Sequence, residues 1–328
     1  MEKVLITGSA GHLGEALAWT LSKQCKSVVG IDIKASPYTT HLGSLTDAEL
    51  VAEVMDGVDT VFHVATLHKP HVVTHSKQDF IDTNVSGTQT LLNAAVEQGV
   101  AAFIFTSTTS VYGHAMQPES NGPAAWVTEQ LVPVAKSIYG ATKLAAESLC
   151  RLQHEQHGLP CLVLRTSRFF PEEDDKASIR AQFSNANAKA NEFLNRRVEL
   201  EDVVTAHICA AEKAAQIGFG TYIVSATSPF TQEDLTELNR HAPEVVAGYY
   251  PDFDSIYQRP GWRMFVQLDR VYVNALARKE LNWQPRFDFR AVLDGLAQDG
   301  NLPESDVSRS IGSKGHHNEE FEDGPFPV

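Results

Sequence analysis

The stretch Thr7–Gly14, TGSAGHLG, lies between a short apolar, β-branched run and a segment whose apolar residues have helical spacing. Gly8 permits a tight turn after a buried strand, and Gly14 permits the following helix to lie close to that strand. Gly11 lets the backbone approach a pyrophosphate, which the free N–H groups at the helix N-terminus would bind. A glycine triplet between a strand and a helix predicts a dinucleotide site, whereas an isolated triplet indicates only a loop.

An acidic residue stands near the end of the next predicted strand, which covers residues 28–33. The carboxylate of Asp32 is placed to bind both hydroxyls of an adenine ribose. It would repel the 2′-phosphate of NADP, so the sequence favours NAD as the cofactor. Lys34 would weaken this preference, but it is better explained as a solvated surface lysine.

Strands and helices alternate along the first half of the chain, as in β-α-β units. Short apolar runs at 4–7, 28–33, 60–64, 101–106 and 161–164 predict buried strands, and 47–55, 79–98 and 139–157 predict helices. Crossovers of this kind build a parallel sheet that is covered on both faces. We therefore expect an α/β fold, a Rossmann-type doubly wound parallel sheet with a smaller C-terminal substrate lobe.

The regular pattern loosens after Arg165, and this change predicts the domain organisation. Residues 1–165 form the predicted nucleotide-binding core, to which a segment near 198–228 returns. Residues 166–197 and 229–300 form the predicted substrate lobe. The last stretch, 301–328, is rich in Gly, Ser, Asp, Glu and Pro, a composition typical of a loose tail.

Composition argues against several classes of partner. The formal net charge of -14 opposes binding to nucleic acid and to anionic membranes. No apolar stretch is long enough to cross a membrane, and the N-terminal run is too short for a signal peptide. The four cysteines, at 25, 150, 161 and 209, match no zinc or disulfide spacing. We expect reduced thiols, a cytoplasmic location and a small-molecule substrate.

Tyr139 and Lys143 stand one helical turn apart in the run Tyr139-Gly140-Ala141-Thr142-Lys143. A free phenol has a pKa of about 10. An ammonium about 5 Å away would lower that pKa by roughly two units at an ordinary protein dielectric, which favours proton exchange near neutral pH. The alternative is a surface tyrosine beside a solvated lysine, which agreement with the glycine turn and Asp32 disfavours.

Further motifs follow in a fixed order between the glycine turn and Tyr139. They are Gly43-Ser44-Leu45-Thr46-Asp47, His63-Val64-Ala65, Asn84-Val85-Ser86-Gly87-Thr88 and Ser107-Thr108-Thr109-Ser110-Val111-Tyr112-Gly113. With these motifs the chain resembles the extended short-chain dehydrogenase/reductase family, in particular its NAD-dependent epimerase/dehydratase branch. The resemblance covers the first half of the chain well, with a weaker match at 201–207.

The resemblance implies a role for each matched position. Tyr139 would be the catalytic acid/base, Lys143 would hold the nicotinamide ribose and lower the pKa of the tyrosine, and Thr108 would hydrogen-bond the reacting oxygen. NAD would lie along the glycine turn and the loops after the later strands. The cofactor-binding candidates are Gly8, Ala10, Gly11, His12, Leu13, Gly14, Asp32, Ile33, Ser44, Leu45, Val64, Ala65, Thr66, Asn84, Tyr139 and Lys143.

The chain departs from the family pattern at three places. Ser44 stands where an aspartate often contacts adenine, and Arg168 stands where sugar-nucleotide enzymes carry an asparagine that contacts the substrate diphosphate. Thr109 and Ser110 replace the Asp-Glu pair of the 4,6-dehydratases. Because neither hydroxyl can replace a carboxyl group in acid or base catalysis, we expect no elimination of water.

Candidate substrate contacts come from loops beside the catalytic residues and from basic residues of the lobe. They are His68, Thr109, Ser110, Arg168 and Arg197. Arginine can bind a phosphate or a carboxylate, although Arg197 is equally explained as a surface residue. The histidines between 63 and 75 match no metal-binding spacing, so we predict no metal site.

These residues together predict reversible hydride transfer between NAD and a secondary alcohol or ketone of a sugar or sugar nucleotide. They do not distinguish an epimerase, in which the hydride returns to the other face, from a dehydrogenase, which releases NADH. One alternative is a dehydrogenase or reductase of a non-nucleotide substrate, such as a sugar acid or a hydroxylated hydrophobic molecule. Another is a non-catalytic NAD-sensing protein, which would be expected to lack Tyr139 or Lys143.

The resemblance also implies a homodimer built by the helices at 84–98 and from Tyr139 onward. Five leucines on these helices give more apolar surface than one sheet face needs. They are Leu91, Leu92, Leu144, Leu149 and Leu152. The alternative is that all five pack inward.

Overall fold

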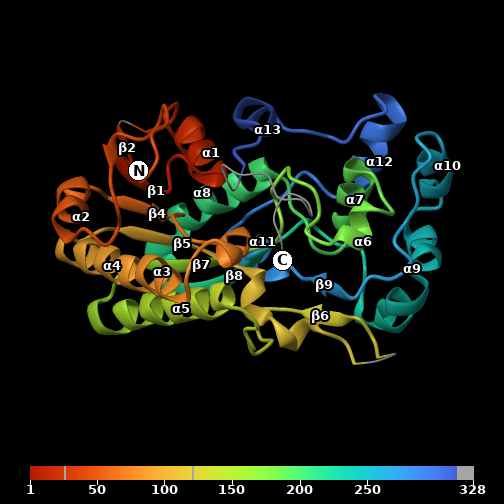
Figure 1. Ribbon diagram of the computed structural model, residues 1–328, viewed down its shortest axis with the longest axis horizontal. Coiled ribbons are helices and arrows are strands. Elements are labelled where there is room, and N and C mark those ends of the chain that lie inside the picture. Colours follow the sequence, from red (N-terminus) through yellow and green to blue (C-terminus); the bar gives the residue numbers. More distant parts are fainter. Residues whose placement is uncertain (26, 120–121, 316–328) are drawn as a thin grey trace.

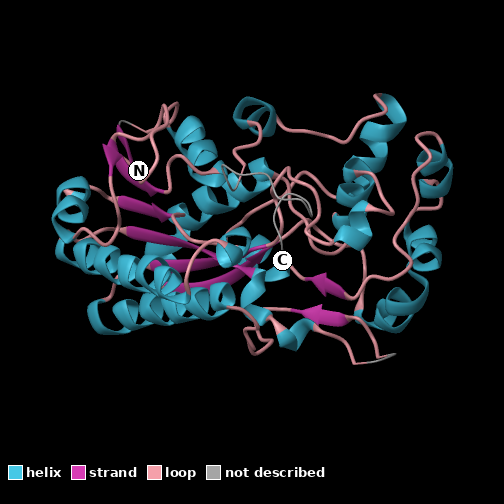
Figure 2. Ribbon diagram, in the orientation of Figure 1, coloured by secondary structure: helices cyan, strands magenta, loops and turns pink. Residues whose placement is uncertain are grey.

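A single parallel sheet organises the first two thirds of the chain in the computed structural model (Figures 1 and 2). The structure describes residues 1–25, 27–119 and 122–315. The strand order is β3-β2-β1-β4-β5-β7-β8, and all neighbouring strands in this sheet run parallel. The strands are β1 (Lys3–Thr7), β2 (Ser27–Asp32), β3 (His41–Leu42), β4 (Thr60–His63), β5 (Ala102–Thr108), β7 (Cys161–Thr166) and β8 (Phe219–Val224).

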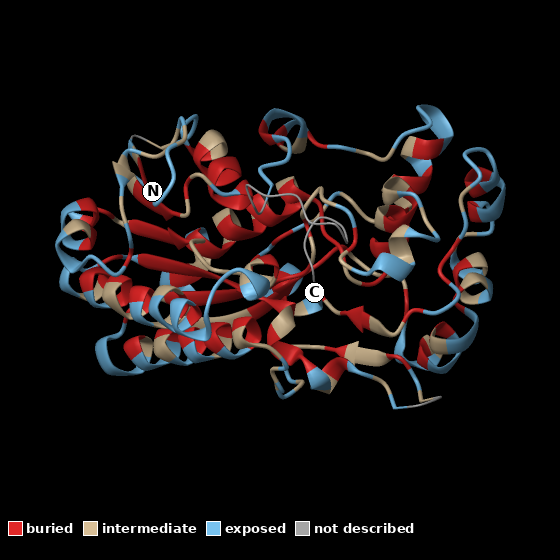
Figure 3. Cartoon of the chain, viewed as in Figure 1, coloured by how far each residue is buried: buried red, intermediate tan, exposed pale blue. Residues whose placement is uncertain are grey.

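Helices cover both faces of this sheet, which confirms the predicted doubly wound, Rossmann-type fold (Figure 3). Successive residues of β1 alternate between the faces: Val4 and Ile6 pack in one apolar cluster and Leu5 in the other. One face carries α1 (His12–Leu21) and α8 (Leu200–Ile217); the other carries α2 (Ala48–Met55), α4 (Gly87–Glu97) and α5 (Ile138–His157). Within the described ranges, no helix combines the length and the hydropathy that crossing a membrane requires.

The helix expected over 79–98 is divided by a wider turn. It comprises α3 (Lys77–Ile81), a π-helical turn η2 (Asp82–Ser86) and α4. π-turns of this kind often occur at functional sites because the extra residue redirects a side chain. Here η2 carries Asn84, whose side chain is buried.

The second half of the chain builds a separate apolar cluster around its own helices. These helices are α6 (Ala177–Arg180), α7 (Asn185–Glu192), α9 (Leu235–Tyr249), α10 (Phe253–Gln258) and α12 (Phe289–Gln298), while α11 (Ala275–Glu280) packs on the main sheet. The expected boundary at residue 165 is wrong for one segment, because β6 (Ala125–Val127) pairs with β9 (Arg270–Tyr272). Three residues give too little periodicity to reveal such a long-range pairing.

The expectation of a loose tail after residue 301 is also wrong where the structure describes it. A short helix, α13 (Asp306–Ile311), buries Val307 and Ile311 in the cluster shared with α1 and α8. The Ser305 hydroxyl donates a hydrogen bond of 2.7 Å to the Glu199 carboxylate. The polar composition of this segment gives no sign of these contacts, because only two apolar side chains pack the short helix against the core. The rest of the predicted tail, 316–328, lies outside the described residues.

The leucines expected at a dimer surface mostly pack within the chain. Leu91 and Leu92 are fully buried in the core, and Leu149 packs against them. Leu144 packs in a smaller cluster around Val111 and Tyr112. Only Leu152 of the five is exposed, at 40%. Four of the five leucines therefore offer no apolar surface to a partner, so the expectation of surplus apolar surface is wrong for them. The dimer itself stays a prediction.

Candidate functional site

The strand order reverses at the carboxyl ends of β1 and β4. β2 and β3 lie on one side of β1, and the later strands lie on the other side. Ligands of open parallel sheets bind at such a reversal, outside the carboxyl ends of the strands. The glycine turn follows β1, and the loop 64–67 follows β4. The fold therefore brings the first sequence motif to the position where a ligand is expected.

The glycine turn is too tightly packed to hold side chains at two of its positions. Gly8 has a φ of 71°, and its N–H donates to the carbonyl of Ile31 at 2.9 Å. A Cβ on Gly14 would lie 1.9 Å from the carbonyl oxygen of Gly8. A Cβ on Gly8 would lie 2.8 Å from the nitrogen of Ala65. The backbone alone thus forms a cradle in front of the N-terminus of α1, as a bound pyrophosphate requires.

Asp32 ends β2 beside this turn. Its carboxylate accepts hydrogen bonds from the backbone N–H groups of Ala10 at 2.9 Å and Lys34 at 2.8 Å. The neighbouring Ile33 and Ser44 are exposed at the same end of the sheet. Asp32 therefore fixes the turn as well as presenting a negative charge next to it.

Two of the predicted cofactor contacts point away from the turn. The side chains of Leu13 and Leu45 are buried in the two apolar clusters of the core. His12 also lies largely buried, with its ring stacked on Phe169 at 6.1 Å between centroids. Leu13 and Leu45 thus serve the packing of the fold through their side chains and offer only backbone atoms to a ligand.

A buried hydrogen-bond chain holds the loop after β4 against the glycine turn. The Thr7 hydroxyl accepts from the N–H groups of Val64 at 3.1 Å and Ala65 at 3.0 Å. His63 Nδ1 lies 2.8 Å from the Thr7 hydroxyl, and its Nε2 lies 2.8 Å from the hydroxyl of Thr88. Burial, followed by the charge of Lys143, lowers the pKa of His63 well below its usual value, so the ring is neutral. Nothing in the local sequence around Thr7 or Thr88 indicates this role, because their partners lie 25 residues or more away in the chain.

Asn84 connects this loop to α5. Its Oδ1 accepts from the Thr66 hydroxyl at 2.9 Å and the Leu67 N–H at 2.8 Å. Its Nδ2 donates to the Leu67 carbonyl at 2.9 Å and to the Thr142 hydroxyl at 3.1 Å. The hydrogen bonds of this amide are thus all made within the protein, where they hold the loop after β4 against α5.

The three predicted catalytic residues meet between β5 and the start of α5. Ser137 begins the helix by accepting the N–H of Gly140 at 3.2 Å. Tyr139 in the first turn is buried and hydrogen-bonded to Thr108, the last residue of β5. Lys143 follows one turn later, with Nζ 4.0 Å from the centre of the Phe105 ring on the same strand. Thr109 is buried next to Thr108.

The expected lowering of the tyrosine pKa is wrong for the protein without a ligand. Burial raises the pKa of Tyr139 to about 12, and the hydrogen bond with Thr108 only partly opposes this rise. Burial likewise lowers the pKa of Lys143 to about 7. Loss of water penalises the charged form of each group. The expectation considered only the attraction between the phenolate and the ammonium, without this penalty.

Lys143 is a buried amine whose hydrogen bonds are not made within the described protein. The side chain is only 2% exposed, and its nitrogen contacts the face of Phe105. Glu147, one turn further along α5, is instead paired with Arg165 at 2.6 Å. An amine that forms no hydrogen bond with the protein is available to a ligand. The cradle at Gly8 and Gly14 together with this amine fits a dinucleotide that carries both a pyrophosphate and a second ribose.

Comparison with known proteins agrees with this geometry. The model of the "NAD dependent epimerase/dehydratase family" matches residues 4–224. The chain belongs to this family. The matched span includes the glycine turn, Asp32, Thr108, Tyr139 and Lys143.

Relatives of this epimerase/dehydratase chain include proteins named for sugar chemistry. An uncharacterized UDP-glucose epimerase of Bacillus subtilis, YtcB, is 34% identical over 185 residues, or 50% of this chain and 55% of that protein. The chain thus matches about half the length of that curated relative. The low-salt glycan biosynthesis protein Agl12 of Haloferax volcanii is 26% identical, covering 89% of this chain and 96% of that protein. The fold also matches UDP-glucuronic acid 4-epimerase from Bacillus cereus, solved with NAD (TM-score 0.61, 21% identity, 90% of this chain and 94% of that one).

Two of the predicted substrate contacts of this family member, His68 and Arg168, lie in loops that touch. His68 in the loop after β4 contacts Phe170 in the loop after β7, with ring centroids 5.3 Å apart. Arg168 lies in the second loop and is surrounded by acidic residues. Arg197 is 5% exposed and donates to Glu192 at 2.8 Å, so its interpretation as a surface residue is wrong.

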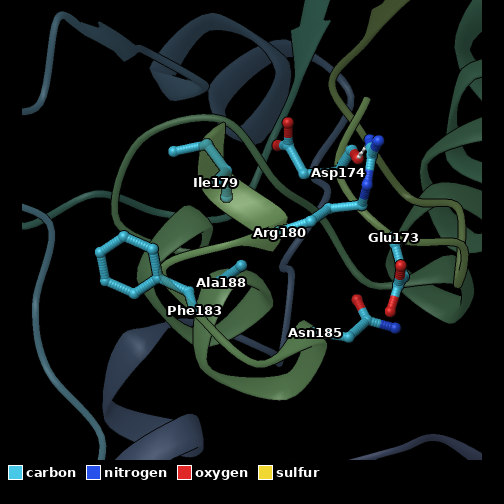
Figure 4. Close-up of a pocket in the computed structure, with 7 residues that line it drawn as sticks. All are labelled: Glu173, Asp174, Ile179, Arg180, Phe183, Asn185 and Ala188. Carbon is cyan, nitrogen blue, oxygen red and sulfur yellow. Dashed lines mark hydrogen bonds between the residues drawn. The ribbon is translucent and has the colours of Figure 1, made fainter. Parts of the chain in front are cut away.

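A small pocket in the lobe is separate from this site (Figure 4). Its volume is about 10 Å³, which is room for about one water molecule. It is lined by Glu173, Asp174, Ile179, Arg180, Phe183, Asn185 and Ala188. The Arg180 guanidinium donates to the carbonyl of Asp174 there, at 2.7 Å. These contacts close a turn of the lobe, and the lining includes no predicted site residue.

Replacing Lys143 by methionine should stabilise the cofactor-free protein. The folded-state pKa of about 7 lies below the usual 10.5, so the unfolded chain binds more protons between these pH values. The free energy of unfolding of the native protein should therefore rise as the pH increases from about 7 to about 10. The variant should lose this dependence and gain roughly 2 kcal/mol at pH 7.

Urea unfolding at several pH values measures both effects. Lys279→Met, which changes an exposed lysine on α11, is the matched control and should alter stability by less than about 0.5 kcal/mol. A Lys143→Met protein that is less stable than the native one at pH 7 would contradict the cost assigned to this amine.

Proposed function

We propose that the protein catalyses reversible hydride transfer between NAD and a secondary alcohol or ketone of a sugar or sugar nucleotide. The observation that carries this proposal is the buried Tyr139, hydrogen-bonded to Thr108 and one turn from Lys143. As the phenolate, Tyr139 takes the hydroxyl proton when the alcohol is oxidised, and as the phenol it returns that proton when the ketone is reduced. Thr108 orients the reacting oxygen. Tyr139 and Thr108 lie at the carboxyl edge of the sheet, where the substrate would enter.

The cofactor-binding role of the chain rests on separate groups. The N–H groups of the glycine turn bind the pyrophosphate, Asp32 binds the adenine ribose, and Lys143 binds the nicotinamide ribose. NAD supplies the hydride acceptor when bound. A ribose hydroxyl would give the Lys143 amine the hydrogen-bond acceptor that its protein surroundings lack. Asn84 acts through Thr66 and Leu67 by fixing the loop next to the turn.

The nicotinamide content of the purified protein tests this function and separates its two forms. Tightly retained NAD, with no NADH released during turnover, supports an epimerase, whose hydride returns to the same substrate. An empty site that fills on addition of NAD and then yields NADH supports a dehydrogenase. The name of one relative favours the epimerase, whereas other relatives are named dehydrogenases. Failure to bind NAD in either form would contradict the proposal.

Replacing Asp32 by alanine should weaken NAD binding and narrow the preference for NAD over NADP by about tenfold or more. The carboxylate would bind two ribose hydroxyls and repel a 2′-phosphate at the same position. Titration of both cofactors by fluorescence measures the change. Asp32→Asn keeps a hydrogen-bond acceptor for Ala10 and separates the effect of charge from that of the turn. An unchanged preference in both variants would show that Asp32 does not face the ribose.

We also propose a cytoplasmic homodimer, in which α4 and α5 meet their copies. The exposed Leu152 on α5 supports that surface. The four cysteines support a reducing compartment, because their spacing matches no disulfide framework. Light scattering at micromolar concentration tests the dimer, and a monomeric mass would refute it.

A further inference from the structure

A short segment at the end of the described chain runs from α13 to two elements of the candidate site. α13 is anchored beside α1 and α8 through Val307 and Ile311 (Figure 1). Gly312 then turns the chain, with a φ of 62° and a ψ of -166°, a conformation that is essentially restricted to glycine. A Cβ on Gly312 would meet no described atom within 4 Å, so the backbone turn, rather than crowding, requires glycine at this position.

Residues 312–315, which we call the strap, contact both α1 and the loop after β7. The Ser313 hydroxyl donates a hydrogen bond to the carboxylate of Glu172, which lies in the loop after β7. The Lys314 ammonium pairs with Glu15, in the first turn of α1, at 2.7 Å. The strap therefore connects the N-terminal part of α1 to this loop.

The strap lies on the side of α1 that faces the loop after β7. Glu15 follows His12 by three residues, so the two side chains share one face of the helix. The His12 ring stacks on Phe169 and also contacts Phe170, with centroids 6.1 Å and 6.0 Å apart, and both phenylalanines belong to that loop. A dinucleotide that extends from the N-terminus of α1 to Lys143 follows the carboxyl ends of β1, β4 and β5, beside this contact. The strap would thus cross the path of the cofactor.

The charges at this place favour a role for Lys314 when a pyrophosphate is bound. The glycine turn, 7–14, contains no lysine or arginine. Glu15 adds a carboxylate to the first turn of the helix whose N-terminus would bind the phosphates. Its repulsion of a pyrophosphate opposes the attraction by the free N–H groups and the helix dipole. Lys314 neutralises this carboxylate and brings a donor that can bind a phosphate oxygen.

We propose that the strap closes over the pyrophosphate of bound NAD, that Lys314 contributes its positive charge to the cofactor site, and that the strap slows release of the cofactor. This inference rests on the proposed function and favours its epimerase form. In an epimerase the hydride returns from the same cofactor to the same substrate, so slow release of the cofactor agrees with that reaction. A dehydrogenase must release NADH in every cycle.

The release rate of the nicotinamide cofactor tests the strap without turnover. The protein is loaded with NADH and mixed with excess NAD, and the loss of bound NADH fluorescence gives the rate. Lys314→Gln should accelerate release by about tenfold, because it removes a charge-assisted contact. Lys314→Arg keeps the charge and should release NADH more slowly than Lys314→Gln. Arg309→Gln is the matched control: it removes a charge from α13, where Arg309 pairs with Asp306 of the same helix, and should leave the rate unchanged.

Replacing Gly312 by alanine tests the path of the strap separately from its charge. The added methyl group strains the turn and should displace Lys314 from Glu15, so release should again be faster, by about fivefold. Gly261→Ala is the matched control, since Gly261 has a φ of 71° and a Cβ there would also meet no described atom within 4 Å. This control should release NADH at the native rate.

Faster release in Lys314→Gln and in Gly312→Ala, with native release in both controls, supports the proposal. Native release in either strap variant overturns it. Equal acceleration by Arg309→Gln and Lys314→Gln also overturns it, because the effect would then come from overall charge. A native protein that binds neither NAD nor NADH counts against the proposed function and the strap together, whereas cofactor binding with unchanged release counts against the strap alone.

Discussion

Replacing Tyr139 by phenylalanine should reduce turnover by about 10³-fold and leave the affinity for NAD nearly unchanged. The substitution keeps the aromatic ring that fills the space beside Thr108 and removes only the hydroxyl that exchanges the proton. The phenol is protonated in the free protein, where burial raises its pKa to about 12, so it cannot accept a proton there. Transfer therefore depends on the positive charge brought by Lys143 and bound NAD at the moment of reaction.

Single-turnover rates and NAD titrations on the same preparation measure this prediction. Tyr249→Phe is the matched control, because Tyr249 is a half-exposed tyrosine on α9, far along the chain from Thr108. The control should keep the native rate. Native turnover in Tyr139→Phe would show that Tyr139 does not exchange the proton. A large loss of NAD affinity would show that it binds the cofactor instead.

Replacing Gly14 by alanine should abolish measurable NAD binding and reduce the free energy of unfolding by about 3 kcal/mol. The added Cβ would lie 1.9 Å from the Gly8 carbonyl oxygen, a backbone atom that cannot rotate away. Relief requires α1 to move from β1, and this movement opens the cradle that the glycine turn forms.

Denaturant unfolding and NAD titration measure the two effects. Gly248→Ala is the control, since a Cβ at Gly248 in α9 would meet nothing within 4 Å. Alanine is the better helix former, so this variant should be unchanged or slightly more stable. If Gly14→Ala bound NAD with native affinity, the turn would accommodate a Cβ at this position, and the steric explanation would be wrong.

The parts of the fold that could be predicted from sequence depend on local signals. The glycine turn, Asp32 and the buried strands each reveal themselves within about 20 residues, because periodicity and turn chemistry are local properties. The π-turn at Asn84 could not be predicted in this way, since the apolar spacing of 79–98 continues across it. The pairing of β6 with β9 joins segments 145 residues apart and leaves no local trace.

The same distinction between local and long-range signals applies to the candidate site. Tyr139 and Lys143 are marked by their spacing and Thr108 by the family resemblance, and the structure brings the tyrosine and the threonine together. Their protonation could not be predicted, because burial depends on the whole fold rather than on two neighbours. Nor could the ion pairs of Asp175 be predicted: the acidic run at 172–175 has the composition of a solvated loop, and only the fold places Lys69 and Arg168 beside it.

Docking of α13 on α1 joins the two ends of the described chain. Lys314 pairs with Glu15 at 2.7 Å across a separation of 299 residues. The ribosome synthesises the chain from its N-terminus, so one side of α1 stays uncovered until the segment 305–314 has been synthesised. Contacts of such long sequence separation form late and slow the search for the native state. A chain stopped before residue 305 would keep the sheet and the three candidate catalytic residues. It would leave apolar surface of α1 and α8 exposed, which chaperones and proteases recognise.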